Sequence, residues 1–408
     1  MSTKNVAINY LRACITLLVL AHHSFLAYAF FLPATSARFV AKPYLWAAFP
    51  VIDTQRWARG FDLFFLFNDT FFMSLMFFLA GLFVCSSVAR KGISTHLRDR
   101  FLRLGLPFLM VGVLLMPLAY YPSYILRGGE PAMGAYLQQW ISLDPWSSGP
   151  CWFIAVLLAF DLLGAFLTRL SPRLIQRLGN MCAGAYGHPA RFFWGLIAAS
   201  SVAYLLLSLP FGPTRWFAFG PLAIQAGRIL LYLTYFLAGM GIGVWGVDRG
   251  LLAQDGRLAQ HWARWLGAAI LAFVLLVVVN TQLLAASAPT SPLLQSISGV
   301  ALALSCGASS FFLLACFVRF AQQRSRILDS LSTNAYGMYL IHYFFVTWLQ
   351  YALLDVKLLP FQKGAIVFTA TVLLSWSVVA GARPIFDAYK RRVKRWAAMR
   401  SEFGTHET

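Results

Sequence analysis

The chain has 408 residues, of which 59% are hydrophobic and only 12% are charged, and its formal net charge is +19. Soluble domains are close to half apolar and about one-quarter charged, so this composition excludes an ordinary soluble globular protein. Several apolar runs approach the roughly 20 residues that a helix needs to cross a bilayer, whereas barrel strands would be short alternating segments. The composition therefore predicts an all-α integral membrane protein.

Ten apolar runs are predicted to span the membrane in one bundle. Their expected ranges are 6–32, 61–89, 104–126, 150–168, 192–210, 225–247, 265–287, 293–318, 335–354 and 364–386. The longest connections, 33–60 and 127–149, are too short for an independent core, and the first, rich in Pro and Trp, is expected to be a lid or an interfacial segment. We thus expect one membrane domain over 1–390 and a basic cytoplasmic tail over 391–408.

Lys and Arg residues concentrate in alternate connections. With ten spans, 22 of them fall on the side that holds both termini and eight on the opposite side, while Arg12, Arg228 and Arg383 lie within or at the ends of spans. Because positive residues are enriched in cytoplasmic loops, both termini are expected in the cytoplasm. Charge placed in this way does not indicate a nucleic-acid partner. The six cysteines lack the spacing of metal sites, so no metal is expected.

The first expected span, "LRACITLLVLAHHSFLAYA", contains Arg12, His22 and His23. Arg12 and His23 are separated by about 20° around a helix and by about 16 Å along it, whereas His22 is turned about 80° away from Arg12. An Arg inside a span costs at least roughly 2.5 kcal/mol, so such residues usually mark a cavity, a partner or a pathway. The simpler alternatives are that Arg12 reaches the lipid headgroups and that His23 only bonds a neighbouring helix.

Three arginines precede the third expected span, in "KGISTHLRDRFLRLGLPF". Arg100 and Arg103 project from neighbouring positions on one helical turn, with Arg98 close by. Guanidinium groups are planar, permanently charged and able to donate in pairs, which suits a phosphate ligand. The alternative is a positive-inside anchor that contacts lipid phosphate.

A polar stripe follows in "LSTNAYGMYLIHYFF", where the ninth span is expected to begin. The Ser, Thr and Asn at 332–334 are expected to cap that helix. Tyr336, Tyr339, His342 and Tyr343 recur at steps of three and four residues and so share one face. A Tyr stripe near a membrane edge is often an aromatic belt, but a histidine within a span indicates function.

Two acidic residues lie deepest in apolar sequence, Asp69 and Asp161. Either could orient a histidine or pair with an arginine, which would offset the cost of burying both charges. Asp69, beside Asn68 and Thr70, is the candidate for orienting a histidine, whereas Asp161 is expected to be structural. Trp152 begins the fourth span and by itself would be an interfacial anchor.

Taken in order along the chain, these segments resemble the acyltransferase 3 superfamily of multi-span membrane acyltransferases. The resemblance rests on the ten-span layout and on Arg12 with His23, Arg100-Phe101-Leu102-Arg103, Trp152-Phe153 and the segment Asn334–His342. The second span, "MSLMFFLAGLFVCSSVARKG", is similar to the branch that contains glucan-succinylating proteins. One departure is Ala382-Arg383-Pro384, where family members often carry an acid and a proline.

The resemblance implies a membrane-bound O-acyltransferase in the cytoplasmic (inner) membrane of a bacterium. The donor would be a cytoplasmic acyl-CoA, either acetyl-CoA or succinyl-CoA, and the acceptor a hydroxyl of a carbohydrate or glycan at or across the membrane. The implied roles are catalytic for His23, as general base, and for Arg12 and Asp69, binding of CoA phosphates for Arg98, Arg100 and Arg103, and substrate binding for Trp152, Tyr336, Tyr339 and His342.

Two other classes of protein have polar residues inside the membrane. A transporter that exports a sugar or a lipid-linked glycan also places Arg, His and Asp on its substrate and proton pathways. Without the family motifs, a transporter would be the first choice. A sensor or scaffold is less favoured, because it has no need for costly polar groups in lipid.

Overall fold

The structure is a computed structural model that describes residues 6–31, 47, 51–57, 60–143, 146–219, 222–247, 249–285 and 291–403. The long helices are α1 (Val6–Leu26), α2 (Gly60–Gly81), α8 (Trp152–Leu170), α10 (Pro189–Phe211), α11 (Ile229–Val244), α13 (Trp262–Ala285), α14 (Pro292–Phe320), α15 (Arg326–Ala352) and α16 (Pro360–Phe403). The shorter elements are α3 (Val84–Lys91), α4 (Ile93–Arg100), α5 (Leu106–Met110), α6 (Met116–Leu126), α7 (Met133–Ile141), α9 (Pro172–Ala183), α12 (Arg257–Gln260) and one hairpin, β1 (Trp216–Phe219) and β2 (Leu222–Gln225). Most of the segment expected to form a lid lies outside the described residues.

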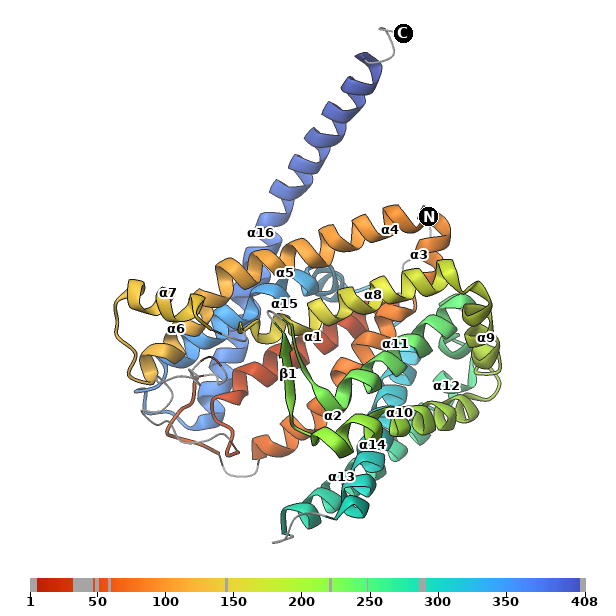
Figure 1. Ribbon diagram of the computed structural model, residues 1–408, viewed down its shortest axis with the longest axis horizontal. Coiled ribbons are helices and arrows are strands. Elements are labelled where there is room, and N and C mark those ends of the chain that lie inside the picture. The colour runs from red at the N-terminus through yellow and green to blue at the C-terminus, as the bar shows by residue number, and fades with distance from the viewer. Residues whose placement is uncertain are drawn as a thin grey trace.

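The all-α multi-span prediction is confirmed. Within the described residues, nine helices are long and apolar enough to cross a membrane. The ninth expected span corresponds to α15, which has 27 residues but is more polar than those nine. This helix packs against α1, α6 and α16 and buries Asn334, His342, Thr347 and Gln350, so its polar side chains face other helices. Figure 1 shows α15 within the bundle and α16 extending well beyond it.

The third span differs from its predicted range. It begins at Ile93, not at 104, and runs to Leu126 through two π-helical turns, Phe101–Gly105 and Val111–Leu115. Each π turn ends two residues before a proline, Pro107 or Pro117. Because proline lacks an N–H and clashes with the preceding turn, a wider turn lets the helix continue. The three arginines expected before the span therefore lie inside its first half.

Side chains of α15 bind carbonyls that prolines of the third span leave without a donor. Proline cannot donate to the carbonyl four residues earlier, so Pro107 and Pro122 each expose one oxygen. Tyr336 Oη donates to the first of these, Arg103 O, at 2.6 Å, and Trp348 Nε1 donates to the second, Leu118 O, at 2.9 Å. Tyr336, a member of the stripe predicted from sequence, and Trp348, which was not predicted, thus fix the third span against α15.

A buried ion pair ties the start of α16 to residues 51–57. Lys363 Nζ lies 2.7 Å from Asp53 Oδ2, and both side chains are at most 1% exposed. Lys363 also donates to Leu354 O at 3.0 Å, and the backbone N–H of Asp53 donates to Ala27 O at 3.0 Å. Because a buried charge is tolerated only when it is paired and hydrogen-bonded, these contacts hold the segment against the end of α1.

Glycines allow α2 and α11 to pack backbone against backbone. A Cβ at Gly239 would overlap the carbonyl oxygen of Phe78, and one at Gly243 would overlap that of Leu82. On the facing helix, a Cβ at Gly81 would overlap the carbonyl oxygen of Phe236. Small residues at helix contacts give the close approach that van der Waals packing in lipid requires.

Substitution Gly239→Ala is expected to lower the melting temperature of the detergent-solubilised protein, because the added methyl must push α2 and α11 apart at a cost of about 1 to 3 kcal/mol. The matched control is Gly267→Ala in α13, where an added Cβ meets no atom within 4 Å. Thermal unfolding followed by tryptophan fluorescence measures both variants. Equal melting temperatures for the two variants would contradict the packing argument.

Candidate functional site

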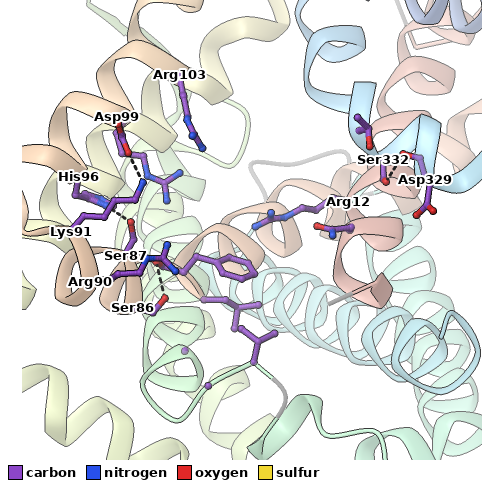
Figure 2. A pocket seen from close by; sticks show the side chains of 18 of the residues that line it. Arg12, Ser86, Ser87, Arg90, Lys91, His96, Asp99, Arg103, Asp329 and Ser332 are labelled. Atoms are coloured by element: carbon purple, nitrogen blue, oxygen red, sulfur yellow. Dashed lines mark hydrogen bonds and ion pairs between the residues drawn. The ribbon is translucent and has the colours of Figure 1, made fainter. Parts of the chain in front are cut away.

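Two cavities lie along α1. The first, here called the basic cavity, has a volume of about 730 Å³ and lies where the beginning of α1 meets α3, α4, the end of α11 and the beginning of α15. Of the described residues that line it, seven are cationic and two are acidic: Arg12, Arg90, Lys91, Arg100, Arg103, Arg324 and Arg383, with Asp99 and Asp329. Figure 2 shows Arg12 and Arg103 extending into this space, with Asp329 on its far side. The excess of cations favours an anionic ligand.

Arg12 is held at the end of α2. Its Nη2 donates to Leu79 O at 2.7 Å, and its guanidinium carbon lies 4.8 Å from the centre of the Phe83 ring. Because α2 ends at Gly81, the carbonyls of its last turn lack helical donors and favour a cation. Arg12 therefore has partners inside the protein, and its side chain reaches the basic cavity from α1.

The structure separates the three arginines of the third span. Arg100 and Arg103 line the basic cavity, whereas Arg98 is exposed and is not among the lining residues. Arg100 Nε also lies 3.5 Å from Asp161 Oδ2, whose side chain is 1% exposed. This pair gives Asp161 the structural role expected for it, since the buried carboxylate needs a cation nearby.

The prediction that residues 332–334 cap the ninth span is wrong. Because α15 begins at Arg326, these residues lie in its second and third turns, and Ser332 and Thr333 line the basic cavity. Arg383, at the position where the chain departs from the resembled family, also lines this cavity and adds a positive charge to it.

The second cavity, here called the histidine cavity, has a volume of about 180 Å³ and shares no lining residue with the first. It lies farther along α1, toward the hairpin. Its described lining residues are Val19, His22, His23, Asp69, Phe72, Met73, Pro150, Trp152, Trp216, Gln225, Tyr232 and Tyr339. Four residues predicted as site residues thus meet here: His23, Asp69, Trp152 and Tyr339. His22, which helix geometry placed on another face, also reaches this cavity.

His342 fixes the orientation of the His23 ring. His342 Nδ1 lies 2.6 Å from Tyr339 O, and its Nε2 lies 3.3 Å from His23 Nδ1. A carbonyl only accepts, so the neutral His342 carries its proton on Nδ1 and accepts at Nε2. His23 Nδ1, which also lies 2.9 Å from Val19 O, then carries a proton. The lone pair of neutral His23 is therefore on Nε2.

His342 is fully buried behind His23 and is not among the residues that line either cavity. Its position therefore suits a positioning residue. Tyr339 Oη donates to Pro150 O and lines the histidine cavity, whereas Tyr336 binds Arg103 O and lines neither cavity. The stripe predicted to bind substrate thus has one member on a cavity wall.

Asp69 pairs with an arginine. Arg228 Nη2 lies 2.6 Å from Asp69 Oδ2, and Arg228 Nη1 donates to Asp69 O at 2.6 Å. The two contacts lock the carboxylate at the cavity wall, where its side chain stays 45% exposed while that of Arg228 is 10% exposed. The sequence places Arg228 within or at the end of a span. The free-energy cost of a charge in lipid was therefore the signal that could have marked Arg228 as a site residue.

The hairpin supplies two residues that sequence reasoning missed. Trp216 of β1 and Gln225 of β2 are paired across the hairpin and both line the histidine cavity. Next to them, the rings of Trp152 and Tyr232 stack with centres 6.0 Å apart, and Trp216 meets Trp152 edge-on at 6.1 Å. The Gly-Pro pair at 220–221 was a turn signal between two short apolar runs. The aromatic rings, the amide of Gln225 and the carboxylate of Asp69 suit a polar ligand that has apolar faces.

The described residues contain no group of three or more His, Cys, Asp or Glu side chains that could hold a metal ion. Along α1, the all-α membrane bundle thus places a histidine pair and a locked carboxylate at one cavity and a cluster of cations at another.

The family comparison identifies this class of protein. A family model described as an acyltransferase domain, that of acyltransferase 3, matches residues 5–380. The chain therefore belongs to the acyltransferase 3 family and is a membrane-bound acyltransferase. No curated protein and no solved structure matched the chain.

Replacing Arg228 by Met is expected to lower the melting temperature, because Asp69 would keep its charge without its partner. The double variant Asp69→Asn/Arg228→Met should recover part of that loss, with a coupling free energy of about 1 kcal/mol or more. Thermal unfolding of the two single variants and the double variant in detergent measures this coupling. Strictly additive effects would show that the two side chains do not depend on each other.

Proposed function

We propose that this acyltransferase moves an acetyl or succinyl group from cytoplasmic acyl-CoA to a hydroxyl of a carbohydrate at or across a bacterial cytoplasmic membrane, with His23 as general base. The observation that carries the proposal is the His23–His342 contact, which fixes the proton of His23 on Nδ1 while the ring lines a cavity. A neutral imidazole whose lone pair is free on Nε2 can accept the proton of a hydroxyl.

The basic cavity is the proposed donor site. Its volume of about 730 Å³ and its excess of cations favour a large, multiply phosphorylated ligand such as CoA. Arg100 and Arg103 bind the phosphates, because guanidinium groups donate to phosphate oxygens in pairs. Arg98, exposed outside the lining, contributes less to this site. The basic loops on the same side support its assignment to the cytoplasm.

The acyl thioester then passes along α1 from the basic cavity to the histidine cavity. Arg12 and His23 mark the two ends of this path, about 16 Å apart along the helix. Thr16 and Val19 lie between them on the same face, and Val19 lines the histidine cavity. Because the two cavities share no lining residue, side chains between α1 and α2 must move apart to admit the flexible arm of the donor.

The histidine cavity is the proposed acceptor site. Sugar rings have apolar faces that pack on aromatic rings and hydroxyls that bind carboxylates and amides, which Trp152, Trp216, Asp69 and Gln225 provide. As the acceptor oxygen bonds to the thioester carbonyl carbon, its proton passes to His23 Nε2. The C–S bond then breaks, and the CoA sulfur leaves with the proton that His23 returns. An acyl-His23 intermediate is the alternative route through the same nitrogen.

Substitution His23→Ala is expected to abolish CoA thiol release that depends on a glycan acceptor, while the protein stays in the membrane at normal abundance. His342→Ala should lower kcat by about tenfold to 100-fold without changing KM for acyl-CoA, since it disturbs only the orientation of the base. His342→Gln, which keeps an acceptor group, should recover part of that loss.

The assay uses purified protein with labelled acetyl-CoA or succinyl-CoA, with and without a glycan acceptor. Wild-type turnover by the His23→Ala variant would refute the assignment of the base. Movement of a glycan across vesicles without thioester cleavage would instead favour the export function. Labelled acyl-protein that accumulates without acceptor would select the acyl-His23 route.

Separate donor and acceptor sites predict separate kinetic effects. Arg103→Gln should raise KM for acyl-CoA about tenfold with little change for the glycan, because a charged hydrogen bond contributes about 1.5 to 3 kcal/mol. Trp216→Ala should raise KM for the glycan alone. Arg173→Gln, an exposed arginine outside both cavities, is the control and should leave both constants unchanged. If Arg103→Gln and Trp216→Ala changed KM for the same substrate, the assignment of separate donor and acceptor sites would be wrong.

A further inference from the structure

A third cavity lies away from the two sites above, where α10 and α13 begin. It has a volume of about 560 Å³ and shares no lining residue with the basic cavity or the histidine cavity. Here called the α10–α13 groove, it is lined at its polar end by His188, Arg191, Arg257, His261 and Arg264. Both helices belong to the candidate membrane spans, so this end of the groove lies at the boundary between lipid and water.

The polar end of the groove is positively charged. Arg191 precedes most of α10, Arg257 lies in α12, and Arg264 lies in the first turn of α13, so three separate elements converge on it. The described lining residues include no acid. Asp255, an acid of the same connection, accepts a hydrogen bond from Tyr186 Oη at 3.1 Å. Three converging guanidinium groups without a carboxylate favour an anion with several oxygens.

The remaining wall of the groove is apolar and aromatic. Phe193 and Trp265 line the groove, and the Trp265 ring packs against Phe193 and against Phe311 outside the lining, with ring centres 5.1 Å and 4.8 Å apart. Trp194, at its edge, is 60% exposed. Tryptophan is enriched at the headgroup level of membranes, where one side of the ring is apolar and the other is wet.

Exposed apolar side chains continue from the groove along both helices. They include Val202 and Leu206 on α10 and Leu271, Val274 and Val278 on α13, each at least half exposed. Both helices pack on α14, and α13 buries few of its side chains. These surfaces face the hydrocarbon of the bilayer, so a ligand with a polar head and apolar chains fits the whole feature.

We propose that the α10–α13 groove binds an anionic phospholipid, with the phosphate held by Arg191, Arg257 and Arg264 and the acyl chains lying on α10 and α13. A soluble phosphate would use the arginines but not the apolar wall and the exposed surfaces below it. Basic pockets between membrane helices on the cytoplasmic side bind anionic headgroups in this way. The site is independent of the acyl-transfer chemistry proposed above.

The experiment measures lipid retention by the purified full-length chain. The protein is incubated with mixed micelles of phosphatidylglycerol and phosphatidylcholine, and the bound lipid is counted by native mass spectrometry. In the triple variant Arg191→Gln/Arg257→Gln/Arg264→Gln, the preference for phosphatidylglycerol over phosphatidylcholine is expected to fall at least tenfold. The matched control, Arg169→Gln/Arg173→Gln/Arg177→Gln, removes three exposed arginines at the end of α8 and in α9 and should retain this preference.

A second variant avoids any change of charge. Ala268→Phe places a ring in the groove that Ala268 lines and should also weaken retention of phosphatidylglycerol, at an unchanged melting temperature. Equal losses in the two triple variants would overturn the proposal, because general charge would then explain binding. Full displacement of the lipid by millimolar inorganic phosphate would overturn it too, since the site would then bind a soluble anion. Retention in the Ala268→Phe variant would exclude the groove as the site.

Discussion

A polar group at membrane depth must find its partner inside the protein, and this constraint organises the structure. Three of the costly side chains have their partner on another segment: His23 contacts His342, Arg12 binds the end of α2, and Asp69 pairs with Arg228. Because each contact joins two helices, the polar groups also fix how the bundle assembles. The geometry of the candidate site and the packing of this acyltransferase therefore depend on the same contacts.

The helix α15 has the largest share in this arrangement. Its hydroxyl and indole groups bind carbonyls that prolines leave free in the third span, and its His342 orients His23. Gln350 Nε2 further donates to His23 O at 2.8 Å, so the backbone of His23 is held as well as its ring. A helix with so many internal partners gains little from apolar side chains, which explains why it is the most polar of the long helices within the bundle.

The two cavities on α1 differ in charge. The cavity at one end of the helix is lined by seven cationic side chains. The cavity at the other end is lined by aromatic rings, two histidines and a carboxylate that is paired with an arginine. A low dielectric in the protein between them strengthens each electrostatic interaction there. The third, lipid-facing groove lies outside this path and adds a contact with the bilayer itself.

The sequence alone determined the all-α membrane class, the family and four residues of the histidine cavity, because apolar run length, helical spacing and the cost of charge in lipid are local properties. Only the tertiary structure decided the partners. Arg228 and Trp216 join the site from segments about 190 to 205 residues after His23 in the chain, and of the three arginines of the third span only Arg100 and Arg103 line the basic cavity. Which side chains meet across helices depends on the angles at which the helices cross and on which partner reaches a carbonyl that a proline leaves free. The residue spacing within a single segment predicts neither.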